Sequence, residues 1–483
     1  MASDYTKILQ EISAADERLH AQLVEKLQVN YDLDRTLVSF QANKTKNGHR
    51  WYKYKEGFSS DLIRYILHKL DLKSGYILDP FAGSGAALFT ASDLGIDSVG
   101  IELLPSSAEI IEVRQIVRSV DAKQIAKEIR QFRDSLVWQR PGNSRSFSHI
   151  RITRGAFPTQ TEIELGRYLF AVENIQEDSL RRVLFFAALC VLEDVSYTRK
   201  DGQYLRWDYR SGRKAGKKPF YKGTIKTFTP AICAKLDQIA GDLYGDQLQF
   251  PELFAEKKLG KIELLTGSCL DILPSLKAES FDGLITSPPY CNRYDYTRTY
   301  ALELAMMGIT EDKIRSLRQS MLSCTVENRE KEDLGQGIEK TRLSRSTAAF
   351  ESQELLKLIL SYLDQCRDEG LLNNTGIPRM VRNYFKELSV VIFECARLLK
   401  PGARFVMVND NVRYQGVNIP VDLILSEIAQ RAGFGAEVIW VLPIGKGNSS
   451  QQMRKHGREE LRKCVYVWVR QKETSQEAKS ETC

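Results

Sequence analysis

A turn that contains two glycines constrains the fold more than any other feature of this 483-residue sequence. The apolar residues 76–78 predict a short buried strand, and the turn Asp79-Pro80-Phe81-Ala82-Gly83-Ser84-Gly85 follows it directly. Small residues at 86–94 then predict a helix, and residues 98–101 predict a second strand that ends at Glu102. Strand, glycine turn, helix and strand in this order open a nucleotide-binding βαβ unit, so we expect an α/β fold with a parallel sheet.

The glycine turn and the acidic strand end indicate a cofactor that carries a ribose but no phosphate. Gly83 and Gly85 allow a ligand to approach the backbone closely. Glu102 can accept hydrogen bonds from both hydroxyls of a ribose. Leu88 occupies the place of the third glycine of dinucleotide-binding turns, which disfavours NAD and FAD and leaves S-adenosylmethionine. An ordinary tight turn between a strand and a helix is the alternative.

A second rigid turn, Ser287-Pro288-Pro289-Tyr290, follows the predicted buried strand at 281–286. Two successive prolines fix an extended backbone and remove two N–H donors, so the carbonyls around them face outward as acceptors. The Ser287 hydroxyl and a proline carbonyl can both accept from an exocyclic amino group, while Tyr290 can stack on the ring. Ligands bind at the carboxyl ends of strands in such sheets, so we expect an amine-binding site rather than a merely rigid loop.

These two turns resemble motifs I and IV of the amino-group DNA methyltransferases, which methylate N4 of cytosine or N6 of adenine with S-adenosylmethionine. The serine of Ser-Pro-Pro-Tyr, where other members carry Asp or Asn, favours cytosine N4. Residues 54–59 resemble motif X and residues 266–271 resemble motif III, in which Asp271 is preferred to Ser268 as the contact to adenine. The resemblance implies a Rossmann-like core with a mixed, mostly parallel seven-stranded sheet and two largely helical or irregular insertions.

The resemblance also implies the residues of the site. The predicted catalytic residues are Ser287, Pro288, Pro289 and Tyr290, and the predicted cofactor-binding residues are Phe58, Ser59, Asp79, Pro80, Phe81, Gly83, Gly85, Glu102 and Asp271. The sequence has no Pro-Cys dipeptide, which argues against a cytosine-C5 enzyme and makes Cys291 a predicted packing residue. The target base has to leave the helix stack to reach this site.

Positive charge is concentrated in one stretch of the chain. The net charge is +7, but ten cations oppose two acids between Arg199 and Lys226, which leaves the rest of the chain close to neutral. Cations can neutralise phosphates, and the interleaved aromatic residues can stack on bases. We therefore expect this stretch to contact DNA rather than to form a solvated loop. The predicted DNA-binding residues are Arg199, Lys200, Arg206, Arg210, Arg213, Lys214, Lys217 and Lys218.

The pattern along the chain predicts a core in three pieces with two insertions. The expected core pieces are residues 45–120, 256–310 and 385–471, preceded by a helical segment at 1–44 and followed by a flexible tail at 472–483. The insertion at 121–255 is the predicted target-recognition region, and the insertion at 311–384 is expected to embrace DNA from the other side. An exposed loop is expected around 327–345.

Composition narrows the partners and the compartment. Nine cysteines without a C-x-x-C pair, and five histidines without an i, i+4 pair, predict neither a disulfide framework nor a metal site. No apolar run is long enough to span a membrane and no leader segment is evident, so we expect a cytoplasmic protein. The expected substrate is double-stranded DNA, with a cognate restriction endonuclease as a partner and the oligomeric state open. Adenine-N6 methylation, RNA guanine-N2 methylation and a non-catalytic DNA-binding subunit are the alternatives.

Overall fold

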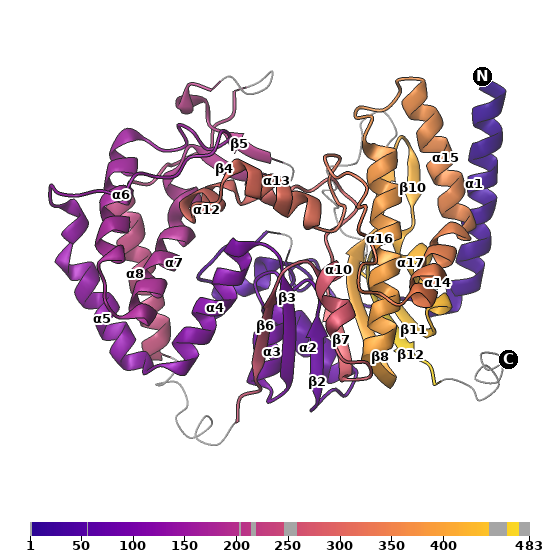
Figure 1. Ribbon diagram of the computed structural model, residues 1–483, viewed down its shortest axis with the longest axis horizontal. Coiled ribbons are helices and arrows are strands. Elements are labelled where there is room, and N and C mark those ends of the chain that lie inside the picture. Colours follow the sequence, from indigo (N-terminus) through magenta and orange to yellow (C-terminus); the bar gives the residue numbers. More distant parts are fainter. Residues whose placement is uncertain are drawn as a thin grey trace.

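A single eight-stranded sheet forms the centre of the protein (Figure 1). The computed structural model describes residues 2–55, 57–201, 204–213, 219–245, 258–443 and 461–472. The strand order is β1-β11-β12-β8-β7-β2-β3-β6, and neighbours run parallel except where β12 pairs with β8 and β11. The strands are β1 (Leu27–Val29), β2 (Tyr76–Asp79), β3 (Asp97–Glu102), β6 (Ile262–Thr266), β7 (Phe281–Thr286), β8 (Leu399–Asp410), β11 (Phe434–Val441) and β12 (Lys463–Arg470).

This architecture confirms the predicted Rossmann-like, mixed and mostly parallel sheet. The sheet has one strand more than expected, because β1 adds to its edge by pairing in parallel with residues 439–441 of β11. The helical segment expected at 1–44 contains helix α1 (Ala2–Leu23), which ends well before residue 44 because the chain turns into β1 after one short 3₁₀ turn. None of the described helices is long and apolar enough to cross a membrane.

The order of the strands creates a crevice at the carboxyl ends of β2 and β7. The chain leaves β2 towards β3 on one side of the sheet, whereas β7 lies on the other side of β2 and is followed outward by β8. Connections that diverge in this way leave a gap outside the strand ends, which is where ligands bind in open α/β sheets. The glycine turn follows β2 and the Ser-Pro-Pro-Tyr turn follows β7, so both predicted motifs open into this crevice.

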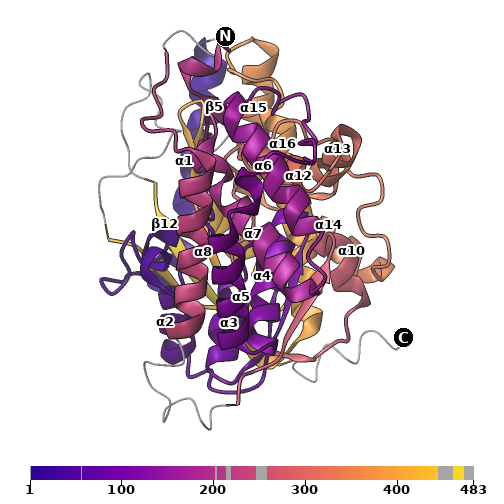
Figure 2. The ribbon, with the colours of Figure 1, turned by 90° about the vertical axis from the view of Figure 1, so that its left-hand side faces the viewer.

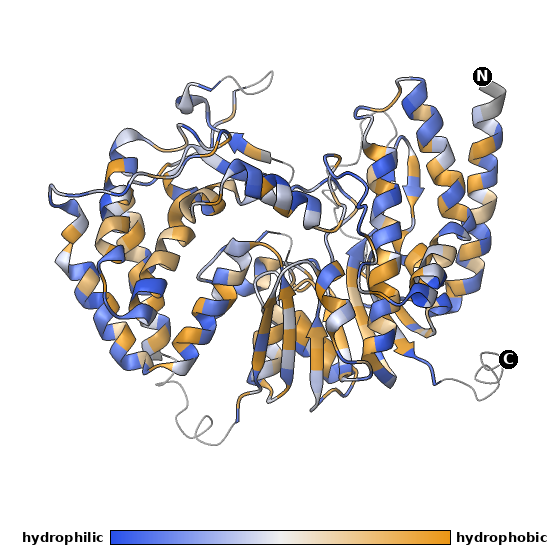
Figure 3. Cartoon of the chain, viewed as in Figure 1, coloured by the Kyte–Doolittle hydropathy of each residue, from blue (hydrophilic) through white to orange (hydrophobic). Residues whose placement is uncertain are grey.

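Alternating side chains hold helices on both faces of the sheet. In β8, Phe405 and Met407 join one core cluster while Val406 and Val408 join another, as the two-residue period of a strand requires. Helices α2 (Ser60–Lys69) and α3 (Ala86–Asp93) cover the second cluster. The first lies under α1, α15 (Glu354–Asp368), α16 (Ile377–Leu398) and α17 (Val421–Arg431). Figure 3 shows the apolar strands between these helices, whose outer faces are hydrophilic.

The first insertion forms a helical body beside the sheet, seen face-on in Figure 2. Helix α4 (Pro105–Ser119) leads into it, and it consists of α5 (Ala122–Ser135), α6 (Thr159–Glu173), α7 (Asp178–Val195), the hairpin β4 (Thr198–Asp201) and β5 (Tyr204–Trp207), and α8 (Phe228–Gly245). Its core also takes in Trp51, Tyr52 and Tyr54 from the segment before the glycine turn. The helical body is therefore fastened to the region that contains the predicted cofactor site.

The second insertion bridges the two bodies and covers one end of the sheet. It contains α13 (Glu311–Ser320), α14 (Lys340–Glu351) and α15, and it is preceded by α11 (Tyr296–Thr299) and α12 (Ala301–Met306). The loop expected at 327–345 is shorter than predicted, because its last residues start α14, which packs on α16 through Ser346. The remaining described α-helix is α10 (Cys269–Ile272), and the remaining described strands are β9 (Val412–Tyr414) and β10 (Val417–Ile419), which pair as a small ladder.

Candidate cofactor and base-binding site

The turn after β2 requires glycine at two positions. Gly83 and Gly85 have φ angles of +55° and +76°, which side-chain-bearing residues rarely adopt. A Cβ at Gly83 would lie 3.3 Å from the Tyr54 ring, and one at Gly85 would lie 2.9 Å from Ile111. Gly83 therefore faces the crevice, whereas Gly85 begins α3 and packs against the core behind the turn.

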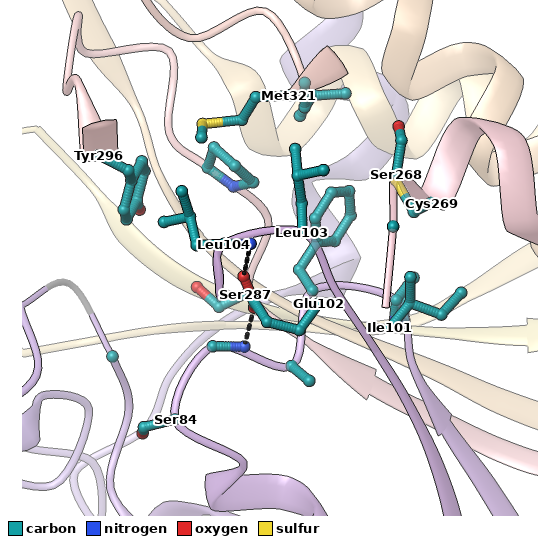
Figure 4. A pocket seen from close by; sticks show the side chains of 18 of the residues that line it. Ser84, Ile101, Glu102, Leu103, Leu104, Ser268, Cys269, Ser287, Tyr296 and Met321 are labelled. Carbon is teal, nitrogen blue, oxygen red and sulfur yellow. Dashed lines mark hydrogen bonds between the residues drawn. The ribbon is translucent and has the colours of Figure 1, made fainter. Parts of the chain in front are cut away.

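Glu102 is held at the end of β3 with its carboxylate beside the glycine turn (Figure 4). The backbone N–H groups of Gly83 and Leu104 donate to its two oxygens, each at 2.7 Å. Burial raises the pKa of Glu102 to about 7, and these hydrogen bonds oppose that rise. A carboxylate has about four acceptor sites, so two remain for the paired hydroxyls of a ribose.

A pocket of about 760 Å³ extends from the glycine turn to the Ser-Pro-Pro-Tyr turn. Glu102 lies between Ser84 on one side of the pocket and Met321 and Tyr296 on the other (Figure 4). Apolar side chains dominate the wall, and no lysine or arginine is among the described residues that line it. The lining residues are Tyr54, Gly57, Phe58, Pro80, Phe81, Ala82, Gly83, Ser84, Ala86, Ile101, Glu102, Leu103, Leu104, Gly267, Ser268, Cys269, Ser287, Pro289, Tyr296, Ser320, Met321 and Leu322.

The Ser-Pro-Pro-Tyr turn places a polar acceptor in this pocket. Ser287 and Pro289 line the pocket, while Pro288 is buried and Tyr290 is half-buried beside it. The Ser287 hydroxyl donates to the backbone oxygen of Val408 at 3.1 Å and lies 3.3 Å from the Tyr290 hydroxyl oxygen. Because the single Ser287 proton is used by a carbonyl, its oxygen lone pairs are available to accept a hydrogen bond.

Five of the nine predicted cofactor residues line the pocket, namely Phe58, Pro80, Phe81, Gly83 and Glu102. Two of the others act behind the wall. Asp79 is fully buried and accepts from Thr286, and Ser59 caps α2 by accepting from the Leu62 N–H at 3.0 Å. Gly85, as described above, packs against the core.

The structure contradicts the prediction for the ninth residue, Asp271. It is exposed on α10 and does not line the pocket, whereas Ser268 does. Ser268 is the N-cap of α10, so it remains in the loop at the strand end, and the helix carries Asp271 away to solvent. The structure therefore favours Ser268 over Asp271 at this position.

Sequence reasoning missed the residues that cover the pocket from the second insertion. Ser320, Met321 and Leu322 follow α13 and reach the wall of the pocket. The Ser268 hydroxyl donates to the Ser320 carbonyl at 2.9 Å and joins the two sides of this roof. These residues lie more than 200 positions after the glycine turn and form no recognisable motif, so no local pattern could have identified them. Tyr296 was missed for the same reason.

The predicted DNA-binding stretch is divided between exposed and internal cations. Arg199 and Arg206 are exposed. Arg206 lies over the Phe220 ring with its guanidinium carbon 4.1 Å from the centroid, and it pairs with the exposed side chain of Asp201 at 3.3 Å. The prediction that Lys200 binds DNA is wrong. Only 4% of this residue is exposed, and its ammonium pairs with Glu303 at 2.5 Å, so it cannot present its charge to DNA. Lys214, Lys217 and Lys218 lie outside the described residues.

Arg210 and Arg213 are also committed to internal contacts. Arg210 pairs with the buried Asp208 at 2.7 Å. Arg213 donates to backbone oxygens of residues 151, 152 and 154 and covers the Trp207 ring. Both side chains fix the segment that follows β5, so neither has its full set of donors free for phosphate.

The pocket fits S-adenosylmethionine on its own features. A glycine turn that a Cβ would fill, a carboxylate with acceptor sites left over and an apolar wall suit a nucleoside with a ribose and a flat base. A wall without described cations gives a phosphate no side-chain counter-charge. Together the Rossmann-like sheet and this pocket define a methyltransferase that uses S-adenosylmethionine.

Comparisons with known proteins specify the family. A family model described as DNA methylase matches residues 3–113. The type II methyltransferase M.AvaI of Nostoc sp. is 48% identical over 461 residues, which are 95% of this chain and 94% of the relative. The type II methyltransferase M.BsoBI of Geobacillus stearothermophilus is 41% identical over 475 residues, 94% and 91% of the two chains. No solved structure shows a significant match. The chain belongs to the amino-group DNA methyltransferases, and specifically to the type II enzymes of restriction–modification systems.

Proposed function

We propose that the protein methylates the exocyclic N4 amine of cytosine in a base that is flipped out of double-stranded DNA. The observation that carries this proposal is the Ser287 hydroxyl, which lies in the pocket and donates its proton to the Val408 carbonyl. A neutral acceptor oxygen that is fixed in this way suits the weakly basic amine of cytosine. It can accept one amine proton without taking it.

The residues of the chain then have defined tasks. The cofactor supplies an activated methyl group on a positively charged sulfur. Ser287 and the backbone oxygen of Pro288 accept the two amine protons, which localises the nitrogen lone pair that is otherwise delocalised into the ring. Tyr290 stacks on the base, and Glu102 holds the ribose of the cofactor. Fixing the amine against the methyl carbon in this way supplies most of the rate, so no covalent enzyme intermediate is needed.

Cys291 is not a nucleophile in this scheme. Its side chain is fully buried next to the Ser-Pro-Pro-Tyr turn, and burial raises the pKa of its thiol well above the ordinary range. A buried thiol in apolar surroundings stays protonated and inert. Its carbonyl accepts from the Tyr414 hydroxyl at 2.6 Å, so this residue helps to anchor the turn.

We further propose that the basic hairpin of β4 and β5 contacts the DNA backbone through Arg199 and Arg206. Both cations are exposed, and β5 packs against α11, which carries the pocket residue Tyr296. A DNA strand on the hairpin would therefore lie close to the pocket that receives the base. The insertion at 121–255 would then be the part of the chain that reads the target sequence.

A nucleoside assay tests the target base. The purified protein is incubated with isotope-labelled S-adenosylmethionine and unmethylated bacterial DNA, and the digested nucleosides are identified by mass spectrometry. Labelled N4-methylcytosine is expected. Labelled N6-methyladenine would leave the mechanism in place but change the target base to adenine. The absence of label from every DNA nucleoside would refute the proposal.

A cognate restriction endonuclease is the partner that we propose for this enzyme. The relatives M.AvaI and M.BsoBI are both named type II methyltransferases, and enzymes of this kind protect DNA from cleavage at the site that they modify. Plasmid DNA modified by the protein should therefore resist at least one member of a panel of restriction endonucleases that cut the unmodified plasmid. Full cleavage by all members whose sites overlap the modified base would contradict this.

A further inference from the structure

A buried cluster connects the basic hairpin to the wall of the cofactor pocket. Lys200 of β4 and Glu303 of α12 are 4% and 1% exposed, and the Lys200 nitrogen lies 2.5 Å from Glu303 Oε1. Tyr52 completes the cluster: Lys200 donates to its hydroxyl at 2.8 Å, and this hydroxyl donates to Glu303 Oε1 at 2.8 Å. Three segments that are far apart in the sequence therefore share one buried charge pair.

This pair is poorly suited to a purely stabilising role. A buried ion pair loses the hydration of both charges, and apolar residues of similar volume often stabilise a fold equally well. Among the described residues, Glu303 Oε2 has no hydrogen-bond partner, so the carboxylate is incompletely satisfied. What such a pair does provide is a single allowed geometry for the segments that carry it.

The geometry is passed to the pocket through stacked rings. The Lys200 ammonium lies 4.8 Å from the centroid of the Tyr300 ring, and that ring stacks on Tyr54 with centroids 5.3 Å apart and planes 22° apart. Tyr54 lines the pocket, and its ring packs against the position of Gly83 in the glycine turn. The Tyr54 hydroxyl also lies 3.1 Å from Ser107 Oγ, so the ring is fixed at both ends.

We infer that Lys200 and Glu303 are positioning residues that couple DNA contact at the hairpin to cofactor binding at Tyr54. DNA that restrains β4 also restrains Lys200, and through the stacked tyrosines it restrains the wall that the cofactor contacts. A ligand that binds a wall already ordered loses less conformational entropy, so the two ligands strengthen each other's binding. The inference rests on the proposal that the hairpin contacts DNA.

The test removes the charge pair without leaving a lone charge. In Lys200→Met/Glu303→Gln the volumes are nearly kept, and the Gln oxygen still accepts from Tyr52. Binding of S-adenosylhomocysteine is measured by calorimetry with and without a saturating duplex that the protein is first shown to methylate. For the wild type we expect the duplex to tighten binding at least about fivefold, which is the lower end of usual coupling. For the double variant we expect less than a twofold change.

Two further variants separate the possible failures. Arg182→Met/Glu109→Gln removes the Arg182–Glu109 ion pair of 2.6 Å and the contact of Arg182 with Glu112. These contacts also join the first insertion to the core but do not involve the tyrosines, so the coupling in this variant should equal that of the wild type. Arg199→Ala/Arg206→Ala should weaken DNA binding; unchanged DNA affinity would show that the hairpin proposal has failed. If Arg199→Ala/Arg206→Ala weakens DNA binding but Lys200→Met/Glu303→Gln keeps the coupling of the wild type, the inference about Lys200 and Glu303 is overturned and the hairpin proposal stands. If the melting temperature of Lys200→Met/Glu303→Gln is within a few degrees of that of the wild type, misfolding is excluded as the cause of its lost coupling.

Discussion

The Thr286 hydroxyl donates a hydrogen bond to Asp79 Oδ1 at 2.6 Å, and this contact joins the carboxyl ends of β7 and β2. Asp79 begins the glycine turn, and Thr286 directly precedes Ser287. The same Asp79 oxygen accepts from the Phe81 N–H at 3.1 Å, while Oδ2 has no hydrogen-bond partner among the described residues. One buried carboxyl group therefore sets the distance between the two turns that hold cofactor and base.

The stability of the protein should fall as the pH rises from about 4 to 7. Burial raises the pKa of Asp79 and of Glu102 to about 7, above the ordinary values of 3.8 and 4.5. Within that window the folded protein keeps protons that the unfolded chain has lost, so each carboxyl stabilises the fold fully at low pH and ceases to do so by its folded pKa. One such proton corresponds to a slope of about 1.4 kcal/mol per pH unit.

Asp79→Asn tests this effect. The amide keeps an oxygen for Thr286 and Phe81 but cannot ionise, so the decline in the free energy of unfolding between pH 5 and 7 should be shallower by about one proton. Urea denaturation at a series of pH values measures it. An unchanged slope in the variant would mean that Asp79 is ionised in the folded protein throughout this range.

Substitution of the two glycines should have different consequences. Gly83→Ala places a methyl group at the pocket face 3.3 Å from Tyr54, so cofactor affinity should fall about tenfold or more with a modest loss of stability. Gly85→Ala places a methyl group 2.9 Å from Ile111 in the core, so it should lower the melting temperature more than Gly83→Ala does. Calorimetry and thermal melting separate the outcomes. If Gly85→Ala kept the melting temperature of Gly83→Ala or exceeded it, our placement of the two residues would be wrong.

Ser287→Ala should lower kcat by about a hundredfold while changing cofactor affinity less than about threefold. The variant removes the acceptor for one amine proton, and misplacement of a reacting group by 1 Å typically costs about that factor. Tyr290→Phe is the matched control, because it keeps the stacking face and loses only the hydroxyl 3.3 Å from Ser287. Single-turnover methylation measures both variants. A rate for Ser287→Ala equal to that of the wild type would place the acceptor elsewhere.

Substitution of two pairs of arginines, one in the hairpin and one after it, should have opposite effects on DNA binding and stability. Arg199→Ala/Arg206→Ala should weaken DNA binding and reduce the dependence of log K on log salt by about one to two units, with little loss of stability. Arg210→Ala/Arg213→Ala should destabilise the segment that follows the hairpin, because Arg210 pairs with buried Asp208 and Arg213 donates to three backbone carbonyls. Salt titrations of DNA affinity and thermal melting provide the comparison. Equal salt slopes in the first variant and the wild type would exclude a phosphate contact.

The sequence was sufficient to predict elements whose signal is local. Apolar runs, the glycine turn and the two prolines each constrain the backbone within a few residues, and β2, β3 and β7 lie where those patterns predicted. The acid at the end of β3 was recognisable because its spacing from the glycines is set by one strand and one helix. These features predicted the class of cofactor and the position of the pocket.

What the sequence did not predict depends on contacts between distant segments. A lysine within a basic stretch is ordinarily solvated, and Lys200 is buried only because α12 brings Glu303 to it. Asp271 seemed the better adenine contact by residue type, yet the N-cap of α10 determines that Ser268 faces the pocket. Met321 reaches the pocket from the second insertion, so no pattern near the motifs could indicate it.

The pairing of β1 with β11 has a consequence for synthesis on the ribosome. Residues 27–29 complete the edge of the sheet only when residues 439–441 are available, about 400 positions later. At about 5–20 residues per second, the first strand emerges tens of seconds before its partner. The nascent N-terminus therefore has to wait without its final contacts while the glycine turn and the helical body are made. When β11 and β12 emerge, they complete the edge of the sheet together with β1, the first strand to be made.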